Sequence, residues 1–262
     1  LKFENSGAMG TDSSGNSNTF SVANGTLRQV DDSPTNVFCT LSSINNSGSL
    51  LYGNPFSVGG GTVIQVPDTP TNVFPTLNPL VAVSPSPTLS EGNLRSTPSG
   101  NGNHTTGANI AMPENSGKWY AETVLTYVSE QSGAFTIQDA NNIQASANTY
   151  SGQYSVTWQA SGTDYFATRQ GGSSETNSTS TAISAGDIFQ IAYDSTNGKV
   201  WFGRNNTWIT GNPSTDTTPT YSSITGDKVF TTTGYRVSSG SSYNEQQVNF
   251  GQDSSFGGSK TA

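Results

Sequence analysis

The sequence predicts an all-β protein: an antiparallel β-sandwich of the jelly-roll type, with a β-rich tandem-repeat segment at its N-terminal side. Short stretches that alternate aromatic or β-branched residues with polar ones recur from residue 118 to residue 250. No window shows sustained apolar periodicity of 3.6 residues, so long amphipathic helices are not expected. Only 11% of residues are charged, and Ser, Thr, Asn and Gly are abundant, as in strands joined by many turns.

Composition also narrows the function classes. An aromatic content of 10% and a net charge of only -8 argue against an intrinsically disordered chain. An isoelectric point near 4.4 and only ten Lys and Arg residues argue against nucleic-acid binding, which needs a basic surface. No stretch approaches the 18 apolar residues of a membrane helix. Cys39 is the single cysteine, which excludes an internal disulfide and favours a small buried apolar residue.

A tandem repeat is the most specific internal feature. Residues 18–41 and 54–77 are identical at 16 of 24 aligned positions, at an offset of 36 residues. Each copy predicts a short strand, a Gly turn, a second strand and a Pro-containing turn, followed by a Val-Phe pair that docks on a neighbouring surface. One copy has too few apolar residues to bury a core alone. Two interpretations remain open: a spacer in a fibre, or a duplicated linker of loop and strand.

Five segments follow from these patterns. Residues 1–17 are the end of an upstream domain or a linker, and residues 18–77 are the two repeat units. Residues 78–113 form a Pro/Ser/Gly-rich lead-in that contains the first strand of the sandwich. Residues 114–252 form the sandwich core, and residues 253–262 a truncated C-terminal linker. The opening Leu1 and the closing residues predict a fragment of a longer protein.

The strands of the core are predicted from residue type and alternation. Residues 118–128 (KWYAETVLTYV) are rich in aromatic and β-branched residues. Residues 134–137 follow a Ser-Gly turn, and Tyr154, Val156 and Trp158 alternate with polar residues, which is typical of a half-buried strand.

The C-terminal part predicts a hairpin and a last strand. Residues 187–194 and 199–203 flank Asn197-Gly198, a strong hairpin signal. Val248 and Phe250 alternate in the last strand. Antiparallel strands at this spacing, with turn residues between them, predict a sandwich.

Several motifs in this order resemble the SPRY (B30.2-like) branch of concanavalin-like sandwiches. The motifs are SGKWYAE at 116–122, AGDIFQIAYD at 185–194, GKVWFGRNNTW at 198–208 and VNFGQ at 248–252, and the resemblance covers about 68–252. Two positions depart from the family. Asn206 replaces the usual turn Gly, but Asn tolerates a left-handed φ, so we expect the turn to persist. VFTTTG at 229–234 replaces the Pro-containing segment that usually precedes the last strand. The sequence therefore does not define the edge of the sheet at this segment.

The segment before the core resembles the form found in bacteriophages and prophages. The residues concerned are DTPTNVFPTLNPL at 68–80 and LSEGNL at 89–94, and residues 1–16 are similar to the end of a laminin-G-like domain. The resemblance implies a structural, non-enzymatic component of a phage virion: a tail fibre, head fibre or appendage. It implies a virion or extracellular location, other virion or fibre subunits as partners in a homo-oligomer, and a host-surface glycan as a further partner.

No catalytic or metal site is predicted. His104, the only histidine, lies in NGNHTTG, which predicts a solvated loop, and no nucleophile elbow accompanies it. Glu122 lies in a predicted strand without a glycanase signature. Asp187 and Asp194 bracket a strand and are expected to terminate it. We expect no cofactor, although a single Ca²⁺ held at a loop by Asp and carbonyl oxygens stays open.

Four residues are candidate ligand contacts: Tyr165, Arg169, Trp208 and Tyr235. Trp201 is not among them, because it lies mid-strand between apolar neighbours and is predicted in the core. Trp208 follows the turn and either packs against the hairpin or serves as an exposed platform for a sugar ring. Tyr165, Arg169 and Tyr235 lie near loops and could add aromatic and hydrogen-bonding contacts.

Two alternative functions stay open beside the virion component. One is a secreted or cell-surface carbohydrate-binding module of lectin type, and the weaker one is the remnant of a glycan-degrading enzyme. The tandem repeat favours the virion component, because a free lectin has little need of a spacer.

Overall fold

The computed structural model describes residues 73–82, 85–129, 131–144, 152–160, 164–171, 173–237, 242–253 and 256. The chain divides into two compact units, residues 1–55 with 68–73 and residues 56–67 with 74–262. All described residues except Val73 belong to the second unit. The tandem repeat up to residue 72, Cys39 and residues 1–17 lie outside the described residues, so the predictions made for them stay predictions.

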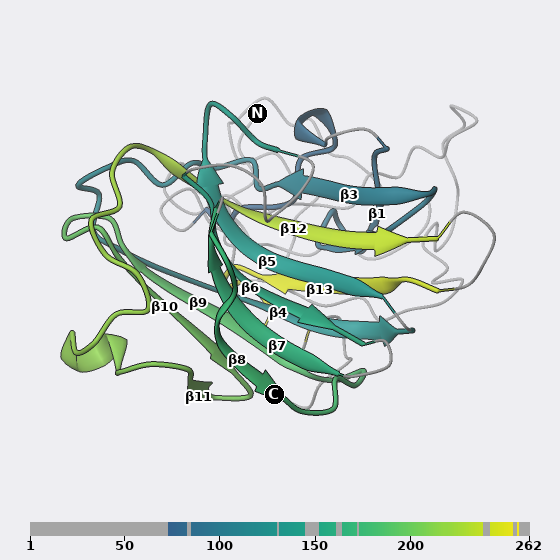
Figure 1. Cartoon of the computed structure of the whole chain (residues 1–262). Helices are drawn as coiled ribbons and strands as arrows, with labels where there is room; N and C mark the ends of the chain where they lie inside the picture. The colour runs from purple at the N-terminus through teal and green to yellow at the C-terminus, as the bar shows by residue number, and fades with distance from the viewer. Residues whose placement is uncertain are drawn as a thin grey trace, which may run out of the picture. The chain divides into compact units, whose positions relative to one another are not determined.

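The described part is a sandwich of two antiparallel sheets (Figure 1), which confirms the predicted fold class. The seven-stranded sheet has the order β1-β2-β13-β4-β9-β10-β11, and the six-stranded sheet the order β3-β12-β5-β6-β7-β8. Two short 3-10 helices, η1 (Pro79–Val81) and η2 (Pro213–Thr215), lie outside the sheets. The strands are β1 (Thr88–Ser90), β2 (Arg95–Thr97), β3 (Gly102–Gly107), β4 (Lys118–Val128), β5 (Ser132–Asp139), β6 (Tyr154–Gln159), β7 (Tyr165–Gln170), β8 (Thr176–Ser180), β9 (Ile188–Asp194), β10 (Lys199–Arg204), β11 (Thr207–Trp208), β12 (Lys228–Arg236) and β13 (Asn244–Asn249).

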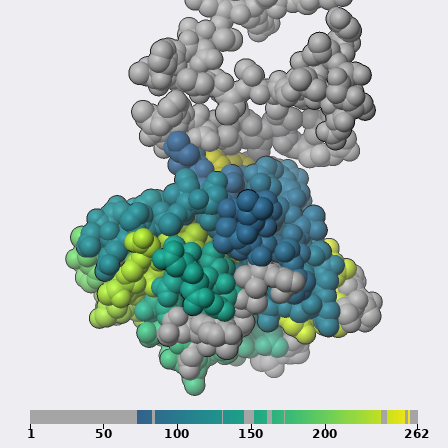
Figure 2. All heavy atoms as spheres, turned by 90° about the horizontal axis from the view of Figure 1, so that it is seen from above, coloured from purple at the N-terminus to yellow at the C-terminus, as the bar shows by residue number. Residues whose placement is uncertain are grey.

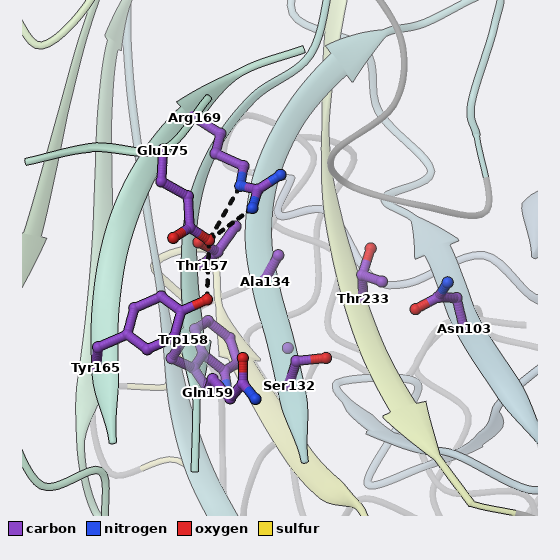
Figure 3. Close-up of a pocket in the computed structure, with 11 residues that line it drawn as sticks. Asn103, Ser132, Ala134, Thr157, Trp158, Gln159, Tyr165, Arg169, Glu175 and Thr233 are labelled. Atoms are coloured by element: carbon purple, nitrogen blue, oxygen red, sulfur yellow. Dashed lines mark hydrogen bonds and ion pairs between the residues drawn. The ribbon is translucent and has the colours of Figure 1, made fainter. Parts of the chain in front are cut away.

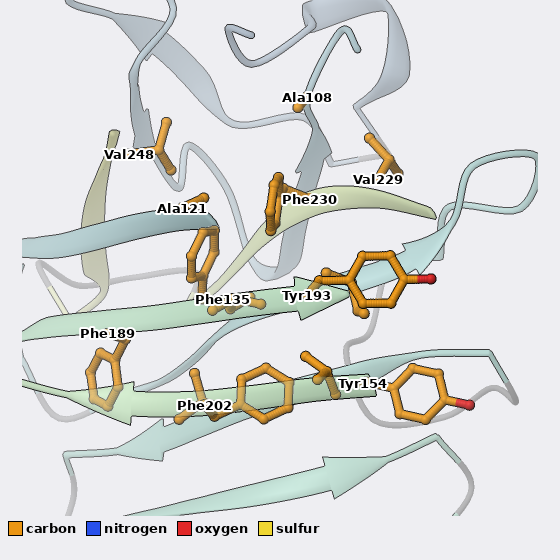
Figure 4. Close-up of a cluster of buried hydrophobic side chains, with 14 of the residues drawn as sticks. Ala108, Ala121, Phe135, Tyr154, Phe189, Tyr193, Phe202, Val229, Phe230 and Val248 are labelled. Atoms are coloured by element: carbon orange, nitrogen blue, oxygen red, sulfur yellow. The ribbon is translucent and has the colours of Figure 1, made fainter. Parts of the chain in front are cut away.

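The core lies between the sheets and is built by strand alternation. Every second residue of β5, β6, β9 and β10 points inward, because successive side chains of a strand face opposite sides of the sheet. Trp158 of β6 stacks on Phe189 of β9, with ring centroids 4.5 Å apart and planes 10° apart, and so joins the two sheets. Other buried residues of this core include Ala121, Phe135, Tyr154, Val156, Ile191, Tyr193, Val200, Phe202, Phe230 and Val248 (Figure 4).

Residues 78–113, in which the sequence predicts one strand, hold three. β1 pairs with β2, β2 pairs with β13, and β3 pairs with β12. Leu77 is buried, and its backbone bridges Ala108. Figure 2 shows this part of the chain, in blue, covering much of one face of the described unit. The lead-in is therefore an integral part of the sandwich.

Two other strands differ from the expectation. The segment 229–234 is not a sheet edge, because it lies in β12, which pairs with β3 on one side and β5 on the other. Ser132 and Gly133 do not form a turn, because they are the first residues of β5. Gly133 is needed there, since a Cβ would lie 2.6 Å from the ring of Trp158.

The turns follow local chemistry. Asn205 and Asn206 adopt φ values of 49° and 62° between β10 and β11, which confirms that Asn supports this turn. Asn197 and Gly198 do not form a two-residue turn. They belong to a longer turn in which the Asp194 carboxylate accepts hydrogen bonds from the backbone N–H groups of Thr196 and Asn197, both at 3.0 Å.

Trp201 is buried as expected, at 2% exposure, but not between the sheets. Its neighbours Val200 and Phe202 point into the core, so Trp201 points to the opposite face of β10. Its indole Nε1 donates a hydrogen bond of 2.9 Å to the carbonyl oxygen of Thr217. The segment after η2 therefore covers Trp201. No helix of the described residues is long and apolar enough to cross a membrane.

Candidate functional site

A groove crosses the outer face of the six-stranded sheet, the face turned away from the other sheet. Trp158 points into the core, so Thr157 and Gln159 of the same strand point outward. Residues from five adjacent strands and from the loop before β8 line this cross-strand groove, whose volume is about 160 Å³ (Figure 3). The lining residues are Asn103, Ser132, Gly133, Ala134, Thr157, Trp158, Gln159, Tyr165, Arg169, Glu175 and Thr233.

Small side chains make the hollow. Ala134 of β5 pairs with Thr233 of β12 on one side and with Thr157 of β6 on the other, and Thr157 pairs with Ala167 of β7. Paired residues of adjacent antiparallel strands face the same side of the sheet. A row of short side chains therefore crosses four strands, and longer side chains such as Tyr165 rise beside it.

Two of the four predicted contacts, Tyr165 and Arg169, meet in this groove. Both project from β7, and both donate hydrogen bonds to one oxygen, Oε1 of Glu175, as the dashed lines of Figure 3 show. The Tyr165 hydroxyl lies 3.0 Å from that oxygen, and Arg169 Nη2 lies 2.7 Å from it. Burial, together with the bond to Glu175, raises the pKa of the Tyr165 hydroxyl. The hydroxyl therefore stays protonated at neutral pH.

Tyr235 lies on the same face of the sheet but outside the groove lining. It pairs with Asn103 of β3, which does line the groove, and it is half-buried near the end of β12. The register of β12 with β5 ends at Gly234 and Gly133, so Tyr235 follows beside Ser132.

Trp208 lies elsewhere. It is half-buried in a second hollow, the rim groove, whose volume is about 440 Å³. Its ring contacts that of Tyr120 edge to face, with centroids 6.4 Å apart. Gly203 of the hairpin lies directly under it, since a Cβ there would lie 3.1 Å from the indole. Trp208 packs on the hairpin and keeps part of its surface open. The rim groove is lined by Phe166, Thr179, Thr181, Arg204, Asn205, Thr207, Trp208 and Ile209.

The carboxylates considered for catalysis have structural partners. Burial alone would raise the pKa of Asp187, but hydrogen bonds from the Ser184 N–H, Asn205 and Arg204 outweigh it and lower the pKa. Burial alone would also raise the pKa of Asp194. Hydrogen bonds from Asn197 and from the backbone of the following turn outweigh that effect and lower the pKa. Both residues bracket β9 as expected.

Glu122 accepts a hydrogen bond from the Tyr120 hydroxyl, which in turn accepts one of 2.7 Å from Gln190. Burial, together with Glu122, raises the pKa of Tyr120 well above its usual range. Glu122 is thus one member of a polar cluster on the outer face of the seven-stranded sheet.

His104 is not a solvated loop residue. It lies in β3 and is fully buried, with Nε2 2.7 Å from the carbonyl oxygen of Gly100. Its even-numbered position places it on the inner face, next to Gly234 of β12. The sequence suggested a loop because β3 consists of Gly, Asn, His and Thr and has no large apolar residue. Within the described residues, no group of three or more His, Cys, Asp or Glu side chains could hold a metal ion.

Most of the groove residues could not be identified from the sequence. Asn103, Ser132, Thr157, Gln159, Glu175 and Thr233 are ordinary polar residues there, and only the strand order brings them together. One signal was available: Thr157 and Gln159 occupy the polar positions of the alternating segment 154–159 and must face outward together.

Comparison with known proteins supports the fold. No family model and no curated protein matches the chain. Among solved structures, the SPRY domain of human HERC1 matches with a TM-score of 0.50 at 12% sequence identity, over 68% of this chain and 99% of that domain. A carbohydrate-binding module, CBM66 from Bacillus subtilis, matches with a TM-score of 0.39 at 8% identity, over 64% of this chain and 92% of that module. The carbohydrate recognition domain of Emp46p matches with a TM-score of 0.44 at 10% identity, over 64% and 87% respectively. The match to the HERC1 domain shows that the chain has a SPRY-like sandwich fold.

Proposed function

We propose that this chain is a non-enzymatic binding domain that holds carbohydrate in the cross-strand groove. The lining of the groove carries the proposal: hydroxyl and amide side chains, one tyrosine, and an Arg–Glu pair whose charges cancel. Ser, Thr and Tyr hydroxyls and Asn and Gln amides both donate and accept hydrogen bonds. Sugar hydroxyls do the same, so a hydroxyl-rich ligand can satisfy this surface.

The aromatic residue suits the same ligand. Tyr165 offers an apolar ring together with a hydroxyl that Glu175 holds in place. A sugar ring has an apolar face and a polar rim. Its face can stack on the tyrosine ring while a hydroxyl of its rim forms a hydrogen bond with the tyrosine hydroxyl. At about 160 Å³, the groove is smaller and more polar than a pocket for a drug-sized apolar ligand.

Three partly buried carboxylates, Asp187, Asp194 and Glu245, suit structural roles better than that of a general acid. A general acid in glycoside hydrolysis needs a raised pKa. Asp187 and Asp194 have lowered pKa values, and so does Glu245, where hydrogen bonds from Thr126, Thr97 and Arg95 outweigh the effect of burial. These groups act as charged hydrogen-bond acceptors that fix turns and join strands.

A second proposal concerns where the domain works. The tandem repeat of 36 residues and the resemblance to phage SPRY-containing proteins favour a structural component of a virion, in a tail fibre, head fibre or appendage. There the sandwich would attach the particle to a host-surface glycan, and the repeat would be the spacer. Repeated units of this kind suit a homo-oligomeric fibre.

A glycan array tests the carbohydrate proposal. We expect the recombinant chain to bind a defined subset of an array of bacterial-surface glycans, and Tyr165→Ala to abolish that signal. Trp208→Ala, outside the groove, is the control and should keep it. A silent array for wild-type protein whose circular dichroism shows a folded β protein would contradict the proposal, as would loss of binding in Trp208→Ala alone.

A further inference from the structure

The direction of the groove carries information about the shape of the ligand. Three of its lining residues, Thr233, Ala134 and Thr157, are successive partners in β12, β5 and β6. A second row beside it runs from Asn103 of β3 to Tyr165 of β7 by way of Tyr235, Ser132 and Gln159, and all of its members except Tyr235 line the groove. A cross-strand row runs perpendicular to the strands. The groove is therefore an elongated trough across the sheet.

Strand spacing gives the length of this trough. Adjacent strands lie about 4.8 Å apart, so the row from β3 to β7 covers four spacings, or about 19 Å. Tyr165 of β7 and Tyr235 of β12 both belong to this row. Tyr165 pairs with Gln159, and Gln159 pairs with Ser132, beside which Tyr235 lies. The two tyrosines are three spacings apart, or about 14 Å, which is farther than one sugar ring can reach.

The charge of the trough also limits the ligand. Of the residues that line it, Arg169 and Glu175 carry charge, and they form an ion pair with 2.7 Å between Nη2 and Oε1. The chain as a whole carries a net charge of -8. An acidic polysaccharide would meet no unpaired cation in the described lining and would be repelled by the protein as a whole.

The position on the sheet face distinguishes a glycan from a peptide. β12, β5, β6 and β7 each pair with a neighbour on both sides, so the strand-to-strand bonds use their backbone N–H and C=O groups. A peptide that adds to a sheet needs a free edge. A ligand on this face meets mainly side chains: hydroxyls, amides, the Arg169–Glu175 ion pair and tyrosine rings.

We propose that the groove holds a linear, uncharged glycan chain laid across β3, β12, β5, β6 and β7, with rings stacked on Tyr165 and Tyr235. This inference rests on the proposed carbohydrate function and specifies its ligand. Tyr235 is then a contact of the longer chains only, because it stands three strand spacings, or about 14 Å, from Tyr165.

The test is an array on which neutral and acidic bacterial-surface glycans are each printed as monomers, dimers, tetramers and hexamers. We expect the wild-type chain to bind a neutral linear type and to bind its tetramer at least tenfold more tightly than its dimer. Tyr235→Ala should weaken tetramer and hexamer binding by about tenfold, a loss of about 1.4 kcal/mol, and leave dimer binding unchanged. Tyr165→Ala should weaken all lengths.

A second variant keeps the test valid if Tyr235→Ala fails to fold. Ser132 is exposed in the middle of the trough, so Ser132→Trp fills it without disturbing the core. We expect this variant to lose tetramer binding. Equal binding of dimer and tetramer, or full tetramer binding by Ser132→Trp, would overturn the linear-chain inference while the carbohydrate function stands. Binding to acidic types alone would overturn the uncharged ligand, and a silent array would overturn both proposals.

Discussion

A single oxygen atom of Glu175 accepts hydrogen bonds from two groove residues and holds both in place. Its Oε1 accepts from the Tyr165 hydroxyl and from Arg169, and the ion pair leaves the groove without net charge. The pair is partly exposed, with side chains about one quarter accessible, so its contribution to stability is small. Its main effect is on the position of Tyr165 and Arg169 and on the charge of the groove.

Glu175→Gln should therefore change selectivity more than stability. The substitution leaves Arg169 without its carboxylate, so we expect binding of neutral glycans to fall severalfold and binding of acidic glycans to appear. Array signals for both classes measure the change. The double variant Arg169→Gln, Glu175→Gln removes both charges and should restore the preference for neutral glycans. Unchanged selectivity in the single variant would show that the pair does not face the ligand.

Trp201 and Trp208 have different roles despite their nearness in sequence. Trp201→Ala removes a buried indole and its hydrogen bond to Thr217, so we expect a loss of about 3–5 kcal/mol. This is a large share of the roughly 5–15 kcal/mol that stabilises a domain. Denaturant unfolding measures it. Trp208→Ala is the matched control and should cost much less, because its side chain is only half-buried. An unchanged midpoint in Trp201→Ala would contradict the burial of Trp201 under the η2 segment.

At the scale of the elements, three carboxylates connect segments of the sandwich and make its stability depend on pH. Glu245 of β13 binds Arg95 and Thr97 of β2 and Thr126 of β4. Asp187 binds Arg204 across the β9–β10 pair, and Asp194 fixes the turn between these strands. The pKa of each is lower in the folded chain than its ordinary value of 3.8 for Asp or 4.5 for Glu.

The sign of the pH dependence follows from this direction. A lowered native pKa means that the unfolded chain binds more protons in acid, so the stabilisation is complete above about pH 4.5 and is lost as pH falls through the native pKa values. We expect the melting temperature to fall steadily below pH 4.5. Glu245→Gln should lower it at pH 7 and weaken the acid dependence. Identical acid dependence in the variant and the wild type would contradict a role for Glu245.

Alternation identified the strands that carry large apolar residues but not the polar ones. β4, β6, β9 and β10 were predictable because aromatic and β-branched residues recur every second position. β3 was not, because its inward residues are His104 and Thr106, which bury without an apolar signal. The groove depends on the order β3-β12-β5-β6-β7, which joins residues more than 100 positions apart. Local sequence carries no information on that register, so Tyr165 and Arg169 could be nominated but not their partners.

At the scale of the whole molecule, the N-terminal half predicts self-association. Within residues 1–113 the sandwich accounts for β1, β2 and β3, and in residues 1–72 the clear apolar anchors are few, such as Phe20, Phe38 and Phe56. Burying three Phe side chains contributes roughly 4.5–9 kcal/mol, whereas ordering each residue of backbone costs about 1–2 kcal/mol. If the repeat segment is ordered, neighbouring surfaces must contribute, and symmetric association is their commonest source.

Light scattering together with hydrogen exchange tests this prediction. We expect the recombinant chain to be a homo-oligomer, with protection in the repeat segment that disappears on dilution to monomer. Protection in β1, β2 and β3 is expected in either state, whereas a monomer whose residues 18–72 are strongly protected would contradict the prediction.

Nuclear magnetic resonance titration tests the central claim, that carbohydrate binds on the outer face of the six-stranded sheet, most directly. The probe is the glycan with the strongest array signal, added to isotopically labelled chain. The structure predicts saturable shifts of the side-chain amide signals of Asn103 and Gln159 and of the backbone signal of Ser132, with no change at Asn205 or Trp208. Shifts confined to Asn205 and Trp208 would place the site in the rim groove and contradict the claim.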